Sequence, residues 1–253
     1  MQNILYFEIY FNKKVVLIVL IQEGKILVIE GTDFSGKTTQ YEKTVEELKK
    51  KGYLFGSDSF PNYDSWSSSF VTAYLRGEFG NDAMSVKPKV ASCFYAMDRY
   101  ASFMQRDWGK TYRDGGNILF ARYLSSNILH QASKYDSWEE VKEFIDWLYD
   151  FECNLLGIPK DDCVILLNMP PEKAQELKQK RLKEQNGLSS NGSEKDIHED
   201  NADYLRRSYE IALKVADYLN WKVVDCVNSE GQLKTIEEIN KEIMMIVESV
   251  FTK

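Results

Sequence analysis

The stretch ILVIEGTDFSGKT, residues 26–38, decides the fold of this 253-residue chain. Its first four residues are all apolar, which predicts a buried β-strand. The segment Gly31–Thr38 then fits the pattern GxxxxGK[ST], and residues 37–51 read as a helix with Val45 and Leu48 on one face. A strand, a glycine-rich loop and a helix in this order are the context in which the pattern binds the phosphates of a nucleotide.

The residue types of this loop suit phosphate binding. Glycines allow a tight turn that exposes backbone N–H groups, and the start of the helix adds the positive end of its dipole. Lys37 would place its charge on the β- and γ-phosphates, and the Thr38 hydroxyl would complete the ligands of a Mg²⁺ ion. The predicted nucleotide-binding residues are Gly31, Thr32, Asp33, Phe34, Ser35, Gly36, Lys37, Thr38 and Thr39.

Outward from the loop, short apolar runs alternate with amphipathic stretches of helical length. Further strands are predicted at 53–60, 117–120, 164–167 and 221–226, and helices at 88–107, 124–134, 141–151 and 236–250. Strands separated by helices form a parallel sheet that helices cover on both faces. We therefore expect an α/β fold, a three-layer sandwich of the P-loop NTPase type with a five-stranded parallel sheet and a mobile lid.

The composition excludes several classes of protein. With 32 Lys and Arg against 39 Asp and Glu, the net charge of −7 disfavours a nucleic-acid polymer as partner. The four cysteines are far apart and form no CxxC pair, so reduced thiols are expected rather than disulfides or a zinc site. The apolar run at 15–21 is too short to span a membrane and lacks a cleavage site after it, which favours the cytoplasm over a membrane or secretion.

Two segments depart from the alternation. Residues 185–200 are polar, with two glycines, three serines and no apolar period, and are predicted to form a mobile loop that serves as a lid or as a connector. Residues 1–22 precede the first required strand. They could form a hairpin, a poorly ordered extension, or upstream sequence included by a wrong start codon. We treat 1–22 as an extension and 23–253 as the P-loop domain.

From about residue 25 to the C-terminus, the chain resembles the thymidylate kinases, which belong to the nucleoside-monophosphate kinases. Short motifs in the family's order carry the resemblance, and the polar segment before Tyr204 stands where the family has its lid. The motifs are the acidic loop residue Asp33, Phe60-Pro61, the segment FYAMDR at 94–99, Ala121-Arg122-Tyr123, Ser126-Asn127 and His130-Gln131.

The resemblance implies a binding site for dTMP. It assigns Arg99 to a carbonyl oxygen of thymine, although an ion pair with an acid such as Asp98 is the alternative. Tyr95 would stack on the base, with core packing as its rival. The other implied contacts are Phe60 as the second wall of the pocket, Arg122 on the acceptor phosphate, Asn127 on the N3 edge of the base, and His130 against the sugar or simply lining the cleft.

Three positions depart from the family pattern. Phe34 stands where some members have an arginine, so the charge on the migrating phosphoryl must come from elsewhere. Arg181 is our candidate, with Lys195 behind it and a solvated basic face as the alternative. Tyr63 stands where many members have an arginine. Ala121 replaces an acid expected near Mg²⁺, a role that Asp33 or Asp98 could take over.

The predicted activity is transfer of the ATP γ-phosphoryl to dTMP, giving dTDP. Its catalytic residues would be Lys37, Arg122, Arg181 and Asp33, with Mg²⁺ as cofactor held by Thr38. The alternatives are a thymidine kinase and a weakly catalytic or non-catalytic nucleotide-binding protein. We further expect two copies of the chain to form a homodimer.

Overall fold

The computed structural model describes residues 4–11, 14–21, 23–80, 82–184 and 202–251. Five strands form one sheet in the order β4-β5-β3-β6-β7, and every neighbouring pair is parallel. The strands are β3 (Ile26–Gly31), β4 (Phe55–Ser59), β5 (Asn117–Ala121), β6 (Cys163–Asn168) and β7 (Lys222–Asp225). The predicted five-stranded parallel sheet is confirmed.

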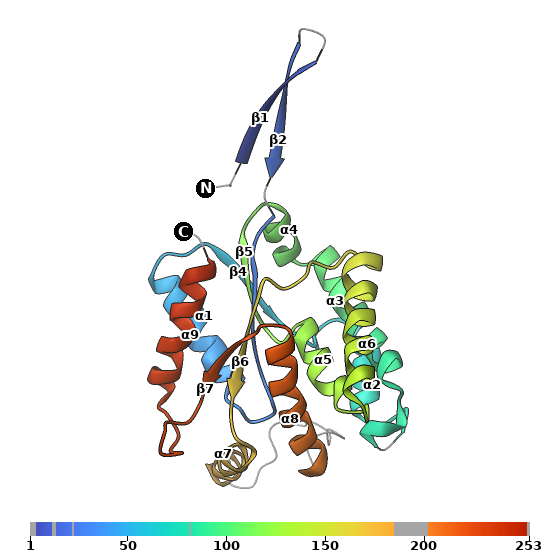
Figure 1. The fold of residues 1–253 in the computed structure, drawn as a ribbon, viewed down its shortest axis with the longest axis vertical. Coiled ribbons are helices and arrows are strands. Elements are labelled where there is room, and N and C mark those ends of the chain that lie inside the picture. The colour runs from blue at the N-terminus through green and yellow to red at the C-terminus, as the bar shows by residue number, and fades with distance from the viewer. Residues whose placement is uncertain (1–3, 12–13, 22, 81, 185–201, 252–253) are drawn as a thin grey trace.

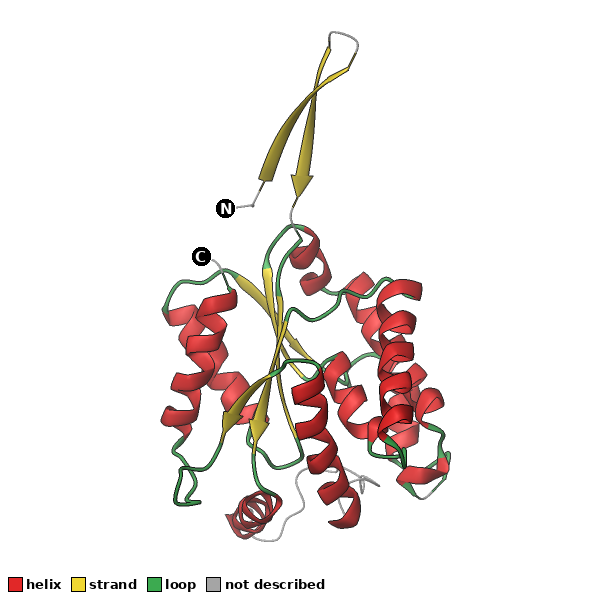
Figure 2. Cartoon of the chain, in the orientation of Figure 1, coloured by secondary structure: helices red, strands yellow, loops and turns green. Residues whose placement is uncertain are grey.

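Helices cover both faces of this sheet, which gives three layers (Figures 1 and 2). On one face lie α1 (Lys37–Lys50) and α9 (Ile236–Val250). On the other lie α5 (Leu124–Ala132), α6 (Trp138–Tyr149) and α8 (Ala202–Tyr218), with α3 (Pro88–Gln105) packed against α5. The predicted helices thus occupy the layers that an α/β sandwich requires.

Alternation along the strands builds the two cores. Ile26 and Val28 of β3 belong to the cluster that includes side chains of α5, α6 and α8. Leu27 and Ile29 belong to the cluster that includes side chains of α1 and α9. Because successive side chains of a strand point to opposite faces, one fully apolar strand serves both cores.

The predicted helix 88–107 is α3, which ends two residues earlier than predicted, and a second short helix that was not predicted follows it. Arg106 has an extended backbone, with φ −94° and ψ 159°, so α3 ends at Gln105 and α4 (Asp107–Arg113) begins directly after it. The turn is tight, because a Cβ on Gly109 would lie 2.0 Å from the carbonyl oxygen of Phe103. The spacing of apolar residues in the sequence does not predict this close packing of α4 on α3.

The segment predicted as a helix around 141–151 continues into a π-helical turn, η3 (Asp150–Leu155). Helix α2 (Ser69–Leu75) was not among the predicted elements, and α7 (Pro171–Glu184) directly precedes the polar segment. A π-helical turn inside an α-helical stretch often marks a functional site.

At the N-terminus, β1 (Ile4–Phe11) and β2 (Lys14–Ile21) pair antiparallel, from Ile4 opposite Ile21 to Phe11 opposite Lys14. The two strands form a hairpin that is not part of the five-stranded sheet (Figure 1). The predicted lid at 185–200 lies outside the described residues. Within the described ranges, no helix is long and apolar enough to cross a membrane.

Candidate nucleotide-binding site

A pocket of about 390 Å³ lies at the carboxyl ends of β3, β4 and β5. Parallel sheets bind their ligands at this edge. The pocket brings together nine of the predicted site residues, which the sequence spreads over almost one hundred positions. They are Asp33, Lys37, Thr38, Phe60, Tyr95, Arg99, Arg122, Asn127 and His130.

The phosphate loop holds its lysine against its own backbone. The Nζ of Lys37 donates to the carbonyl oxygens of Gly31, at 2.5 Å, and Thr32, at 2.7 Å. Burial lowers the pKa of Lys37 to about 7, and the nearby charge of Arg122 acts in the same direction. A Cβ on Gly31 would lie 2.5 Å from Ser35 Oγ and 3.2 Å from the backbone oxygen of Leu167, so a larger residue would force these neighbours to shift. A bound phosphate would replace the two carbonyls as the partner of the ammonium group.

Arg122 follows β5 in the left-handed backbone region, with φ 65°, a strained conformation that is concentrated at functional sites. Its NH2 group donates to Asp33 Oδ1 at 3.0 Å, and its NH1 group lies 3.1 Å from His130 Nε2, which accepts because a guanidinium can only donate. Burial raises the pKa of Asp33, but the charges of Arg122 and Lys37 outweigh this and hold the pKa below its usual range.

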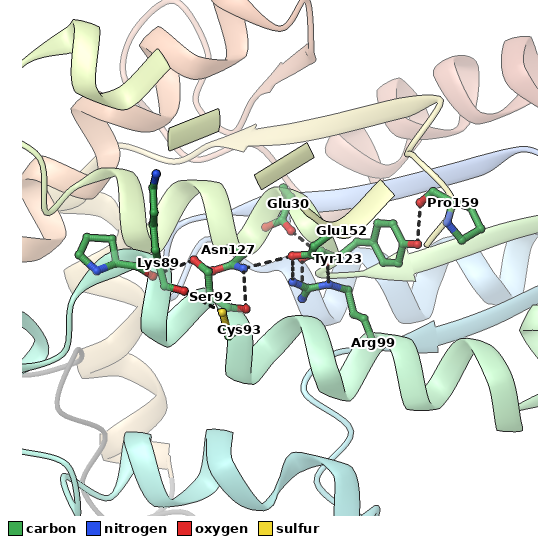
Figure 3. A network of polar contacts seen from close by, with 10 residues as sticks. Glu30, Lys89, Ser92, Cys93, Arg99, Tyr123, Asn127, Glu152 and Pro159 are labelled. Carbon is green, nitrogen blue, oxygen red and sulfur yellow. Dashed lines mark hydrogen bonds and ion pairs between the residues drawn. The ribbon is translucent and has the colours of Figure 1, made fainter. Parts of the chain in front are cut away.

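Arg99 is the largest fully buried side chain in the described part of the structure. Its Nε and NH2 donate to the two carboxylate oxygens of Glu152, at 2.6 and 2.5 Å, rather than to the neighbouring Asp98 (Figure 3). Glu152 was not predicted, because it lies in the π-helical turn more than 50 positions further along the chain. Arg99 still lines the pocket, so an ion pair and a place beside the ligand coexist.

The two predicted aromatic walls also serve the core. Phe60 is 5% exposed and packs on Phe120 and Tyr123, with ring centroids 5.5 and 6.0 Å apart. Tyr95 packs edge-on against Tyr74 at 6.3 Å. Core packing and lining of the pocket, posed as alternatives from the sequence, are both present.

Two buried carboxylates hold the walls of the site: Glu30, which was given no role from the sequence, and Asp98, which was considered as a partner of Arg99 or as an acid near Mg²⁺. Glu30 Oε1 accepts from the hydroxyls of Ser125, at 2.9 Å, and Ser126, at 2.5 Å. Asp98 accepts from the N–H of Asn62, at 2.8 Å, and from Ser67 Oγ, at 2.6 Å, and so anchors the chain after β4. The sequence did hold a hint of the role of Glu30, because this acidic residue lies between an apolar run and the phosphate loop.

The departures from the family pattern lie at the site as well. Ala121 and Tyr63 line the pocket. Phe34 lies under Lys178 of α7, with Nζ 4.9 Å from the ring centroid. Arg181 belongs to α7, but its side chain is outside the described part, and Lys195 lies wholly outside it.

The donor set fits a nucleotide-bound magnesium ion. Asp33 and the exposed Thr38 supply hard oxygen donors at the same pocket. Within the residues that the structure describes, no three His, Cys, Asp or Glu side chains form a cluster that could hold a metal. Mg²⁺ typically takes one or two protein ligands and completes its shell with substrate phosphates and water, which matches this arrangement.

Comparisons with known proteins agree with this site. The thymidylate kinase family matches residues 29–237. A probable thymidylate kinase of Caldivirga maquilingensis is 25% identical over 220 residues, which cover 87% of this chain and 91% of that relative. A thymidylate kinase of Mycobacterium tuberculosis is 28% identical over 172 residues, covering 68% and 78%.

Among solved structures, a thymidylate kinase of Candida albicans is similar in fold, with a TM-score of 0.58 at 18% identity, covering 90% of this chain and 92% of the other. The family match spans the phosphate loop, the strand-end Arg122 and the helix that carries Asn127. With most of its length matched, the chain belongs to the thymidylate kinase family.

Proposed function

We propose that this chain transfers the γ-phosphoryl of ATP to dTMP and so makes dTDP. The observation that carries the proposal is one pocket that holds both a phosphate-loop lysine, Lys37, and the base-contacting candidates Tyr95, Arg99 and Asn127. A protein that only binds ATP has no use for a second set of residues suited to a pyrimidine. Family membership supports the same activity.

In this proposal the residues of the pocket position two nucleotides. Lys37 exchanges its two backbone carbonyls for ATP phosphates, and Arg122 binds the phosphate of dTMP bidentately. Asp33 keeps Arg122 oriented through their 3.0 Å ion pair. Little covalent chemistry is required of the protein, because phosphoryl transfer depends mainly on alignment and on positive charge around the migrating group.

Thr38 and Asp33 would hold Mg²⁺ together with the ATP phosphates, and the ion would neutralise charge on those phosphates. For the charge on the migrating phosphoryl, Arg181 remains our proposal. Lys178 is a second candidate on the same helix, because it already lies over Phe34 of the loop. His130 would face the sugar, and Phe60 and Tyr95 would enclose the base.

Thymidine kinase activity is the second candidate from the sequence. It requires a carboxylate beside the 5′-hydroxyl of thymidine, and Asp33 is the carboxylate among the residues that line the pocket. Asp33 is bonded to Arg122 and its pKa is held low, which makes it a poor proton acceptor. A monophosphate acceptor, in contrast, gives Arg122 an anionic partner.

An acceptor panel tests the proposal. ADP release is measured with ATP, Mg²⁺ and, in turn, dTMP, dUMP, UMP, dCMP and thymidine. We expect dTMP to give the highest kcat/KM. Faster phosphorylation of thymidine than of dTMP would contradict the assignment of a monophosphate acceptor.

We also propose that residues 23–253 form the catalytic unit and that two copies associate as a homodimer. Support for the dimer comes from α3, where Val90, Met97 and Met104 follow one another at seven-residue spacing and are 47, 42 and 57% exposed. Residues seven apart lie on one face of a helix, so α3 presents an apolar stripe. A cytoplasmic location and the absence of a nucleic-acid partner stay predictions.

A further inference from the structure

Glu152 lies at the centre of a buried polar network next to the pocket (Figure 3). Its side chain is fully buried, and its Oε1 accepts both from Arg99 NH2, at 2.5 Å, and from Asn127 Nδ2, at 3.3 Å. A deprotonated carboxylate can only accept hydrogen bonds. Both Arg99 and Asn127, which line the pocket, must therefore present a hydrogen-bond donor to Glu152.

The orientation of the Asn127 amide follows from this demand. Nδ2 also lies 3.4 Å from the backbone oxygen of Ser92, a second group that can only accept. If the amide were turned by 180°, Oδ1 would face both of these oxygens and two buried acceptors would lose their donor. The chemistry of the neighbours thus fixes Nδ2 toward Glu152 and Oδ1 away from it.

In this orientation, the Asn127 side chain can form only one kind of hydrogen bond with a ligand. The two N–H groups of Nδ2 are directed to Glu152 and to the Ser92 carbonyl. Oδ1 lies 3.1 Å from Ser92 Oγ and keeps a second lone pair. Toward a ligand in the pocket, the amide can therefore accept but cannot donate.

We propose that Glu152 is a positioning residue that locks Asn127 as a hydrogen-bond acceptor and thereby makes the pocket reject cytosine. The inference rests on the proposed function, because it takes Asn127 to meet the N3 edge of a pyrimidine. Thymine and uracil carry a hydrogen on N3, whereas N3 of cytosine is an acceptor. Against a locked Oδ1, cytosine would bring two acceptors together, and an unpaired buried polar group is costly.

The test compares dTMP, dUMP and dCMP as acceptors in wild type and in Glu152→Gln. Wild type should use dTMP and dUMP and discriminate against dCMP. The glutamine amide can donate to Oδ1 of a turned Asn127, so turning then leaves one buried acceptor, the Ser92 carbonyl, without a donor instead of two. We expect the ratio of kcat/KM for dCMP to that for dTMP to rise about tenfold or more, mainly through KM, which is the size of one mismatched buried hydrogen bond.

Two further variants separate positioning from loss of stability. Glu152→Asp keeps an ionised acceptor and should leave the dCMP to dTMP ratio within about threefold of wild type. Ser102→Ala removes a different buried hydrogen bond on α3, the 2.8 Å bond from Trp108 Nε1, and should lower the melting temperature without changing the ratio.

Wild type that uses dCMP as well as dTMP would overturn the inference, as would a folded Glu152→Gln with the wild-type ratio. If Glu152→Gln does not fold, wild type and Glu152→Asp still decide, because either one accepting dCMP contradicts the lock. Calorimetric binding of dTMP and dCMP gives the ratio without turnover. A wild-type chain that discriminates between them but transfers no phosphoryl would contradict the proposed function alone.

Discussion

At the scale of single residues, Lys37 gives the site a measurable proton linkage. Its pKa is lowered to about 7 by burial and then by Arg122, so part of the population is uncharged above pH 7 in the free protein. The charges of a bound triphosphate favour the ammonium form and raise that pKa again. ATP binding should therefore take up a proton near pH 7.5–8.5, and ATP affinity should fall as the pH rises through this range.

Isothermal titration calorimetry in two buffers of different ionisation enthalpy measures this proton uptake at saturating Mg²⁺. The control is Lys37→Ala, which should lose the uptake and most of the transfer activity, by about 10²–10³-fold in kcat. Lys43→Ala, on the same helix but paired with Glu237 at the surface, should behave as wild type. No proton uptake by wild type at these pH values would show that Lys37 is charged in the free protein.

Ala121 yields a second residue-scale prediction. Asp98 is committed to the loop after β4, so Asp33 is the carboxylate left beside Ala121 to act near Mg²⁺. We expect Asp33→Asn to raise the Mg²⁺ concentration needed for half-maximal rate several-fold. Ala121→Asp should not lower that concentration, because a second carboxylate near Asp33 adds like-charge repulsion.

Mg²⁺ titrations of wild type, Ala121→Asp and Asp33→Asn measure this directly. If Asp33→Asn keeps the wild-type Mg²⁺ dependence while Ala121→Asp improves it, the missing acid was not compensated by Asp33.

The residues of the site were predictable where a sequence motif carries them. Lys37 and Thr38 stand in a continuous pattern, and Arg122 follows a strand end. The role of Glu152 could not be predicted from the sequence, because its contact with Arg99 joins two segments that only tertiary packing brings together. The buried role of Arg99 was equally invisible, since nothing local distinguishes an arginine paired inside the core from one at the surface.

At the scale of elements, continuous apolar strands and amphipathic helices were predicted to within a few residues. Helix α4 was not predicted, because it begins directly after the extended Arg106 and its seven residues are too few to show an apolar period of their own. The π-helical turn η3 was missed for a related reason. Its wider hydrogen-bond pattern shifts which side chains face inward, and the apolar spacing of the helix before it gives no warning.

The N-terminal hairpin offers a prediction at this scale. Strands β1 and β2 pair with each other and are not part of the five-stranded sheet. Deletion of residues 2–22 should therefore leave kcat and the melting temperature close to those of the full chain. A longer deletion, of residues 2–28, removes half of the central strand β3 and should abolish folding.

Activity assays and thermal denaturation of the full chain and of both deletions provide the measurement. Loss of transfer on removal of residues 2–22, with the fold intact by circular dichroism, would assign a role in catalysis to the hairpin.

At the scale of the whole molecule, the apolar stripe of α3 predicts that Met97→Glu converts a dimer into a monomer. A charge in the middle of the stripe would lie at the centre of a two-fold contact, where each copy meets the same residue of the other. Met245 of α9, which is 59% exposed on the far face of the sheet, gives the matched control Met245→Glu. The mass of each variant follows from light scattering after gel filtration, and a monomeric wild type would contradict the proposed dimer.

The central claim is that the protein transfers the γ-phosphoryl group of ATP to dTMP while both nucleotides are bound in this pocket. The most direct test incubates the full chain with ATP, Mg²⁺ and dTMP and quantifies ADP, dTDP and inorganic phosphate by chromatography. The account predicts one dTDP for each ADP, with little free phosphate, because both nucleotides are held at the same edge of the sheet. ADP formed with an equal amount of phosphate and no dTDP, or nucleotide binding without any ADP, would contradict it.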